Sequence, residues 1–154
     1  MKKAFTLIEI LIVLTVIAVL VSIVLPSLFG LKQEANLSKA STDLAILQTS
    51  IEAYYNKNHY YPIDENDYQT ELIQETGLLN SYYNDPFIKK DSRYAYHHYE
   101  AASGKKYFLL ISPGLNRQLD FDTAHSSAML FIDAGQFTMP ENCDDLIVTN
   151  LLRI

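Results

Sequence analysis

The chain has 154 residues, of which 49% are hydrophobic, and a formal net charge of −6 at pH 7. This length suffices for one small domain with a modest hydrophobic core. From residue 31 onward, ten Lys and Arg stand against 17 Asp and Glu, and this net charge of −7 disfavours direct nucleic-acid binding. The single cysteine, Cys143, excludes an internal disulfide.

The first predicted element is an apolar helix near the N-terminus. Between Ile10 and Leu25 the only polar residues are Thr15 and Ser22, whose hydroxyls can bond to helix carbonyls. A helix over residues 5–30 rises about 39 Å, more than the roughly 30 Å hydrocarbon core of a bilayer. No signal-peptide cleavage site follows the apolar run, so the sequence predicts a retained membrane span.

One carboxylate, Glu9, stands at the head of this apolar segment. Ionisable groups are costly inside a membrane helix and commonly face a protein partner. We therefore predict that Glu9 pairs with a positive group, the alternative being a carboxylate at the membrane edge. Lys2 and Lys3 stay cytoplasmic under the positive-inside rule, which predicts a cytoplasmic N-terminus and an exported C-terminal part.

The helix is predicted to continue beyond the membrane as the spine of a domain. Six apolar residues recur at alternating three- and four-residue spacing: Leu37, Ala40, Leu44, Leu47, Ile51 and Tyr54. Residues 56–59 and the following Pro62 supply a stop. The sequence thus predicts one long helix, of which the second half offers an apolar face for packing.

The rest of the chain is predicted to form a sheet after a connecting segment. Residues 63–84 are polar and irregular, with a short helix over residues 68–75 that ends at Gly77. Runs rich in aromatic and β-branched residues then predict strands at 94–99, 106–111, 129–133 and 136–139. Three or four antiparallel strands folded against the long helix give an α+β fold.

The N-terminal segment carries a family resemblance. Phe5-Thr6-Leu7-Ile8-Glu9, preceded by basic residues and followed by the apolar helix, resembles the class III signal of type IV pilins and type II secretion pseudopilins. In that family a prepilin peptidase cuts before the Phe and methylates the new amine. The resemblance implies a leader over residues 1–4, cleavage between Ala4 and Phe5, and N-methylation of Phe5. Ala4 departs from the glycine that the family usually has there.

The same resemblance assigns roles to the helix. It implies an assembly helix over residues 5–30 and an exported pilin-like domain over residues 31–154. Glu9 would then pair with the Phe5 amine of a neighbouring subunit, because opposite charges attract strongly in a low dielectric. Pro26 matches the family's proline, which permits a kink in the helix.

The order of the later motifs resembles the major pseudopilins of type II secretion: residues 60–62 (Tyr-Tyr-Pro), 85–87 (Asp-Pro-Phe), a hairpin and 112–114 (Ser-Pro-Gly). In that family the next loop carries calcium, and the oxygen donors available here are Asn116, Asp120 and Asp122. Calcium takes six to eight oxygens, so carbonyls or water would complete the site. Arg117 stands where the family has glycine, and its positive charge opposes the binding of a cation. The alternative to a calcium site is that these acidic residues are solvated side chains of a loop.

Other reactive side chains offer little sign of catalysis. His97 and His98 are adjacent and would point to opposite faces of a strand, whereas His59 and His125 lack partners at metal-ligand spacing. Cys143 is interpreted as a small buried residue with an unreactive thiol. The 11 tyrosines either cover a thin core or supply binding contacts.

We therefore predict a structural subunit of a pilus-like filament, specifically a pseudopilin of type II secretion and not an enzyme. Its expected partners are copies of itself, other pseudopilins, prepilin peptidase, a membrane assembly platform and that platform's ATPase. We expect that no cofactor is required, and calcium is the one cofactor that the resemblance suggests. The protein is expected to cross the inner membrane once and to place its domain in the periplasm or outside the cell. A minor pilin or competence pseudopilin that binds a target at a filament tip is the alternative.

Overall fold

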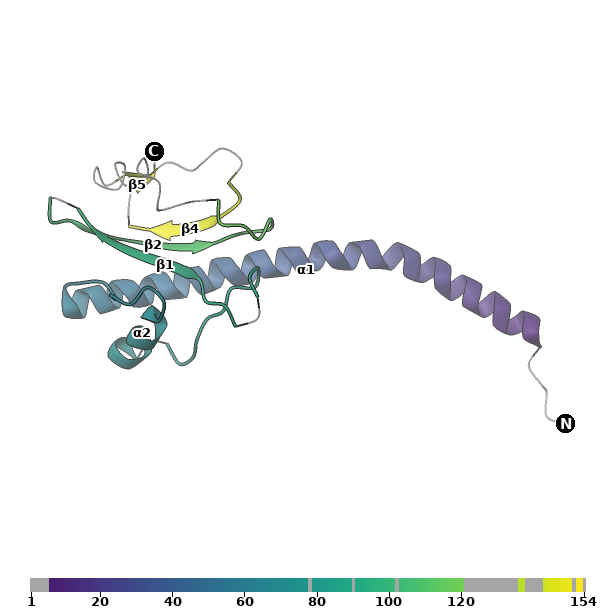
Figure 1. The fold of residues 1–154 in the computed structure, drawn as a ribbon. Helices are drawn as coiled ribbons and strands as arrows, with labels where there is room; N and C mark the ends of the chain where they lie inside the picture. The colour runs from purple at the N-terminus through teal and green to yellow at the C-terminus, as the bar shows by residue number, and fades with distance from the viewer. Residues whose placement is uncertain are drawn as a thin grey trace. The chain divides into compact units, whose positions relative to one another are not determined.

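The computed structural model describes residues 6–77, 79–89, 91–101, 103–120, 136–137, 143–150 and 152–153. The chain divides into two compact units, Met1–Ala35 and Asn36–Ile154. Helix α1 (Leu7–Asn58) contributes to both and confirms the prediction of one long helix (Figure 1).

The first unit consists of the apolar part of α1. Its large apolar side chains are exposed from Leu7 to Leu31, so this part of the helix is hydrophobic all round. The hydroxyl of Thr15 donates to the Leu11 carbonyl at 2.7 Å, and that of Ser22 donates to the Val19 carbonyl at 2.7 Å. Both polar groups are thus satisfied within the helix, as predicted. Among the described residues, α1 is the one helix long and apolar enough to cross a membrane.

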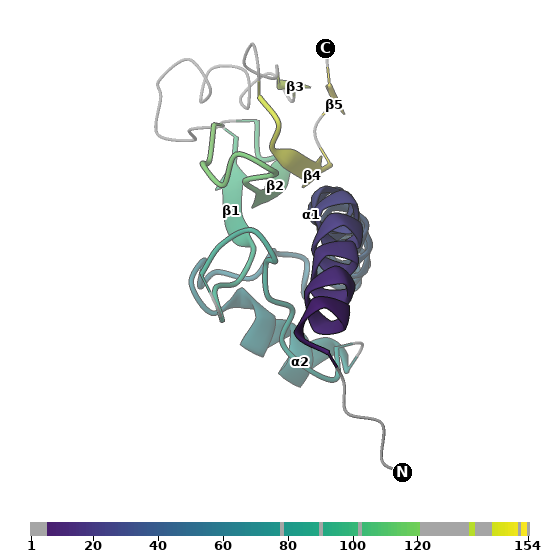
Figure 2. The same cartoon turned by 90° about the vertical axis from the view of Figure 1, so that its right-hand side faces the viewer.

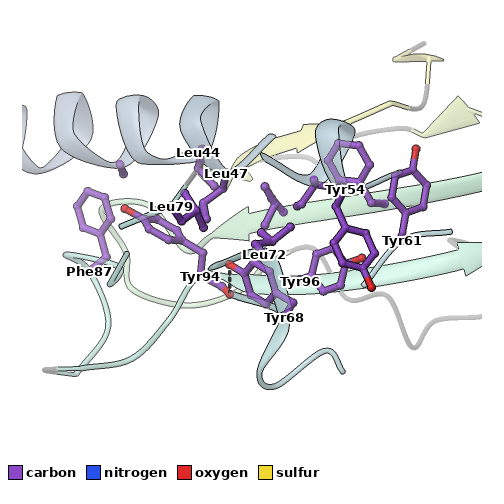
Figure 3. Packing of buried hydrophobic residues seen from close by; sticks show 14 residues of the cluster. Leu44, Leu47, Tyr54, Tyr61, Tyr68, Leu72, Leu79, Phe87, Tyr94 and Tyr96 are labelled. Carbon is purple, nitrogen blue, oxygen red and sulfur yellow. Dashed lines mark hydrogen bonds between the residues drawn. The ribbon is translucent and has the colours of Figure 1, made fainter. Parts of the chain in front are cut away.

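The core of the second unit lies along the later half of α1. The predicted stripe is buried at Ala40, Leu44, Leu47, Ile51 and Tyr54, and Leu37 packs against it half-buried. Figure 3 shows this stripe meeting aromatic rings from the sheet, of which Tyr96 stacks on Tyr68 with ring centroids 4.6 Å apart. The three- and four-residue spacing therefore identified the face of the helix that packs on the domain.

The short second helix follows the prediction closely. Helix α2 spans Tyr68–Thr76 and ends at Gly77, whose φ of 64° places it in the left-handed region that glycine tolerates. The buried Tyr68 and Leu72 turn one face of α2 toward the core. Figures 1 and 2 show α2 and the sheet both lying alongside the later half of α1.

The sheet confirms two predicted strands and adds one that the sequence did not predict. Strands β1 (Ala95–Glu100), β2 (Lys106–Ser112) and β4 (Leu146–Thr149) form an antiparallel sheet in the order β1-β2-β4. The strand predicted at 129–133 lies outside the described residues. Strand β3 (Gln136–Phe137) falls in the predicted 136–139 run, but it pairs in parallel with β5 (Leu152–Arg153), so an antiparallel strand there was wrong.

The strand β2 is buried on both of its faces. Phe108 and Leu110 join the cluster on α1, whereas Tyr107, Leu109 and Ile111 form a second apolar cluster. The first cluster provides the helix-on-sheet core, and the second provides a smaller core on the opposite face of the sheet. A near-continuous apolar run is the expected sequence of such a central strand.

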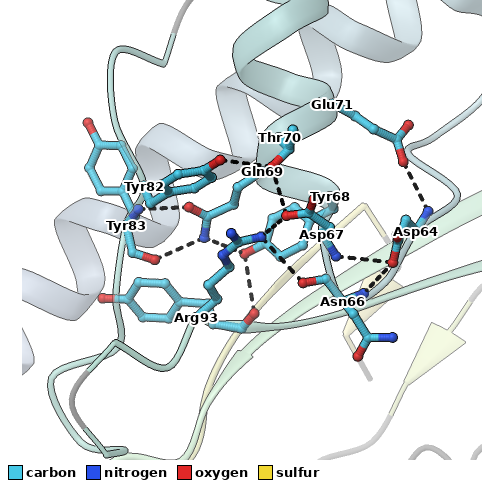
Figure 4. A network of polar contacts seen from close by, with 11 residues as sticks. Asp64, Asn66, Asp67, Tyr68, Gln69, Thr70, Glu71, Tyr82, Tyr83 and Arg93 are labelled. Atoms are coloured by element: carbon cyan, nitrogen blue, oxygen red, sulfur yellow. Dashed lines mark hydrogen bonds and ion pairs between the residues drawn. The ribbon is translucent and has the colours of Figure 1, made fainter.

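A polar network joins α2 and its neighbouring loops to Arg93, which precedes β1 (Figure 4). The buried amide of Gln69 donates to the Tyr83 carbonyl at 2.9 Å and accepts the Tyr83 N–H at 2.7 Å. Arg93 pairs with Asp67 and lies over the Tyr82 ring, with its guanidinium carbon 4.3 Å from the ring centroid. These contacts give the irregular segment defined partners that its composition did not reveal.

Candidate functional site

Glu9 closes a capping box at the start of α1. The Glu9 N–H donates to Thr6 Oγ1 at 3.3 Å, and Glu9 Oε2 accepts the Thr6 N–H at 2.9 Å and the Thr6 hydroxyl at 2.7 Å. This reciprocal pair satisfies helix donors that would otherwise lack partners. The sequence reasoning missed this role, although a Thr followed three residues later by Glu is its usual signal.

The capping box leaves part of the carboxylate for another group. Both Thr6 donors bind Glu9 Oε2, and among the described residues no hydrogen bond reaches Oε1. The predicted cleavage residues Ala4 and Phe5 lie outside the described residues, so their pairing with Glu9 stays a prediction. Helix α1 continues past Pro26, whose side chain is not described, and the predicted kink likewise stays a prediction.

The predicted calcium loop is bound to a second acidic segment. The Asn116 N–H donates to Asp144 Oδ2 at 2.9 Å, and the Asp120 N–H donates to Asp145 Oδ2 at 2.9 Å. Within the loop, Asn116 Nδ2 donates to Asp120 Oδ2 at 2.7 Å. Asp144 and Asp145 were absent from the predicted site. Two adjacent aspartates before a β-branched run were the available signal, but nothing local connected them to a loop 25 residues earlier.

Gly114 allows these two segments to approach closely. It has a φ of 62°, and a Cβ at this position would lie 2.2 Å from the Asp144 carbonyl oxygen. Only glycine combines this left-handed conformation with such a close backbone contact. The loop of residues 113–120 is therefore held against residues 143–145 by both hydrogen bonds and packing.

The oxygen donors of this region suit a hard divalent cation. Asp144 Oδ1 is buried and has no hydrogen-bond partner among the described residues. Ligand atoms of Asp120, Cys143 and Asp145 lie within 4.8 Å of one another. Carboxylate and amide oxygens suit calcium, whereas a thiol does not. Asp122 lies outside the described residues, and the Arg117 side chain is exposed. Asn116, Asp120, Asp144 and Asp145 are therefore the described residues that could hold calcium, and the predicted site stays a prediction.

The structure also places Cys143 and the two adjacent histidines, His97 and His98. Burial raises the pKa of the half-buried Cys143 thiol, and the nearby Asp145 carboxylate adds to this shift, which agrees with the interpretation of an unreactive thiol. His97 Nδ1 lies 3.0 Å from Glu65 Oε2, and the His98 N–H donates to Glu65 Oε1 at 3.2 Å. The two histidines thus contact one carboxylate, which accepts a backbone N–H of the edge strand β1.

An apolar N-terminal helix with a methylation signal, joined to a small α+β domain, defines a pilin-like subunit. Residues 1–25 match the prokaryotic N-terminal methylation motif, and residues 27–126 match the family of type II secretion system protein G. The second match covers more than half of the chain. The protein therefore belongs to the type II secretion system protein G family.

Several relatives carry the same name. The chain is 29% identical over 147 residues to the type II secretion system core protein G of Klebsiella pneumoniae, with 94% of this chain and 92% of the relative covered. It is 33% identical over 91 residues to core protein G of Escherichia coli K12, covering 58% of this chain and 63% of that relative. No solved structure matches the chain.

Family membership establishes the broad class of function. Protein G is a structural pseudopilin, so the chain is a subunit that assembles with other pseudopilins and is anchored in a membrane by α1. The methylation motif implies processing by prepilin peptidase. These matches do not favour the alternative of a minor pilin or competence pseudopilin at a filament tip.

Proposed function

We propose that this chain is a filament-forming pseudopilin that drives protein secretion through repeated addition of subunits at the inner membrane. Prepilin peptidase removes residues 1–4 and methylates Phe5, and an assembly platform with its ATPase lifts each subunit out of the bilayer. The domain faces the periplasm or the exterior. The observation that carries this proposal is the match to protein G over residues 27–126, joined to an apolar helix with the methylation motif.

The capping box gives Glu9 two successive partners. In the single subunit, Thr6 holds Glu9 Oε2 through two short hydrogen bonds and so fixes the carboxylate beside the helix start. During assembly, the Phe5 amine of a neighbouring subunit binds the same carboxylate. A fixed carboxylate loses less conformational freedom when it binds, which favours the intersubunit pair.

Three substitutions separate the helix cap from the charge pair. Glu9→Val removes both, whereas Glu9→Gln keeps a capping side chain and removes only the charge. We expect normal membrane insertion but few filaments from both variants. Thr6→Ala, which weakens the cap and retains the carboxylate, should still assemble. Filaments counted by electron microscopy provide the measurement, and normal assembly of Glu9→Gln would refute the role of the charge.

Processing is tested by the intact mass of the protein extracted from membranes of its native host. We expect a chain that begins at methylated Phe5, because a small side chain at Ala4 retains access to the peptidase. Ala4→Gly, which restores the residue that the family usually has, is the matched control. A mature population that begins at unprocessed Met1 would contradict the proposed processing, whereas incomplete cleavage that Ala4→Gly corrects would locate the defect at Ala4.

Calcium binding forms the second part of the proposal. Asn116 and Asp120, together with Asp144 and Asp145, supply amide and carboxylate oxygens, and Asp122 belongs to the same segment of sequence. A bound cation would neutralise acidic groups that lie close together and would join the 113–120 loop to residues 143–145. The buried Asp144 Oδ1, without a hydrogen-bond partner in the described part of the chain, supports this assignment.

A further inference from the structure

A pocket lies where α1 ends and the β1-β2 hairpin turns. It has a volume of about 220 Å³ and is lined by Tyr60, Tyr61, Ile63, His98, Tyr99, Glu100 and Lys106. Tyr60 is 42% exposed and Ile63 is 66% exposed, so large apolar surface remains uncovered at its mouth. A cavity of roughly 150 Å³ holds a benzene molecule, so this pocket has room for an aliphatic side chain.

Two exposed leucines lie beyond the other end of the same sheet. Leu115 is 45% exposed and Leu119 is 49% exposed, both in the 113–120 loop that follows β2. This loop presents its side chains in a fixed arrangement, because Asp144 and Asp145 accept the N–H groups of Asn116 and Asp120. An ordered apolar side chain loses little entropy on docking and is therefore a suitable binding element.

One chain cannot bring these two surfaces together. Lys106, the first residue of β2, borders the pocket, and the leucine loop begins after Ser112, the last residue of β2. A strand of this length separates its ends by about 20 Å at 3.3 Å per residue. The leucines can reach such a pocket only on a second copy, displaced along the strand direction.

We infer that the 113–120 loop of one subunit docks Leu119 into the Tyr60–Ile63 pocket of the next subunit and places Leu115 on the exposed apolar surface at its mouth. This inference rests on the proposed filament function. The contact joins two different surfaces, and such a heterologous contact, when it does not close on itself, repeats into a filament. At the pocket, Glu100 lies opposite Lys106 in the β1-β2 pairing, and the loop carries Arg117 and Asp120. Each surface therefore presents one charge of each sign, which favours the orientation that brings Arg117 to Glu100.

Cysteine cross-linking tests the contact in assembled filaments of the full chain. In a Cys143→Ser background, Ile63→Cys and Leu119→Cys are introduced together. Oxidation should then give a ladder of trimers and larger species on a non-reducing gel, whereas either cysteine alone should give none. A matched pair combines Ile63→Cys with Gln74→Cys, which is exposed on α2, and should also give no ladder.

The outcomes separate this inference from the proposed function. Filaments that show no ladder, or that link Ile63→Cys to a different protein, overturn the inference and leave the pseudopilin function intact. A wild-type chain that forms no filaments overturns both. As a second measurement, Ile63→Asp should lower filament yield about tenfold, equivalent to about 1.4 kcal/mol. Adding Leu119→Arg should restore part of that loss through a new pair of opposite charges, and absence of any rescue would contradict direct contact.

Discussion

The hydroxyl of Tyr94 donates a hydrogen bond of 2.9 Å to Oδ2 of Asp43, and this bond joins the beginning of the sheet to α1. Both residues are buried, and Lys39 Nζ donates to the same oxygen at 2.6 Å. Burial raises the pKa of Tyr94, and the hydrogen bond to Asp43 adds to this shift, so the hydroxyl stays a donor. Two donors thus satisfy this buried carboxyl group, which would be costly to bury without partners.

We expect Tyr94→Phe to lower the free energy of unfolding by about 1 to 3 kcal/mol, because a buried carboxylate loses a donor while the aromatic packing remains. Tyr82→Phe is the matched control. Its hydroxyl meets Thr70 Oγ1 at 3.0 Å on the surface, so the loss should stay within about 0.5 kcal/mol. Urea unfolding of the full chain in detergent micelles provides the measurement, and equal losses in the two variants would contradict the role of Asp43.

Sequence patterns within single elements predicted both helices and the two strands of the hairpin. The apolar stripe from Leu37 to Tyr54 became the packed face of α1, and Gly77 ended α2 where its freedom at positive φ is needed. The hairpin strands followed their aromatic and β-branched runs. In each case the signal lay within one element, so a pattern along the chain was sufficient.

Long-range pairing accounts for what the sequence did not reveal. Strand β4 is only four residues long, and its place in the sheet depends on Ile147 lying opposite Ile111 of β2. The same separation hid the bonds from Asp144 and Asp145 to the 113–120 loop. The spacing of apolar residues along the chain does not predict such contacts, because they join segments that meet only in the folded structure. The capping box at Thr6 differs, since its signal was local and was overlooked.

The contact between Gly114 and the Asp144 backbone predicts a strong effect of one added methyl group. Gly104→Ala is a matched control, because its φ of 78° is equally unfavourable but nothing lies within 4 Å of the new Cβ. We expect about 1 to 2 kcal/mol of destabilisation from Gly104→Ala, which is the cost of the left-handed conformation. Gly114→Ala should cost clearly more, because its Cβ also collides with the Asp144 carbonyl. Similar losses in thermal unfolding would argue against this close approach.

Because the amide of Gln69 both donates and accepts, we expect a substitution of the same shape to destabilise the fold. Gln69→Glu keeps an acceptor for the Tyr83 N–H but replaces the donor to the Tyr83 carbonyl with a carboxylate oxygen. Because this side chain is fully buried, we expect a loss of about 3 kcal/mol or more at pH 7, and less at pH 4, where the new carboxyl binds a proton and can donate. Chemical unfolding at both pH values tests this, and a loss that does not depend on pH would contradict it.

We expect the contribution of Asp85 to the stability of the fold to decrease as pH rises. Its side chain is 4% exposed and accepts the Phe87 N–H at 2.8 Å, and burial raises the pKa of its carboxyl. The folded state therefore binds the proton more tightly than the unfolded state, whose pKa is about 3.9. The resulting stabilisation is complete below that pH and is lost as pH rises through the folded pKa. Asp43 and Lys39 are the charged groups that act on it.

Asp85→Asn retains an acceptor for Phe87 and removes the ionisation. We expect the variant to be more stable than the wild type at pH 7, with the difference shrinking below about pH 4. Asp67→Asn should behave oppositely, because hydrogen bonding to Arg93 lowers the pKa of Asp67 and its stabilisation is lost as pH falls. Parallel unfolding curves from pH 3 to 8 test both signs, and the same sign in both variants would contradict the assignment.

The buried oxygen of Asp144 predicts a response to calcium. A cation that binds only the folded state at 100 times its dissociation constant stabilises it by about 2.7 kcal/mol. We therefore expect calcium to raise the melting temperature of the full chain in micelles and a chelator to reverse the effect. Asp144→Asn keeps an acceptor for the Asn116 N–H but removes the charge, so the shift should disappear. Asp64→Asn, exposed and outside the site, should keep it. A wild-type chain with no shift at millimolar calcium would leave these aspartates as solvated loop acids.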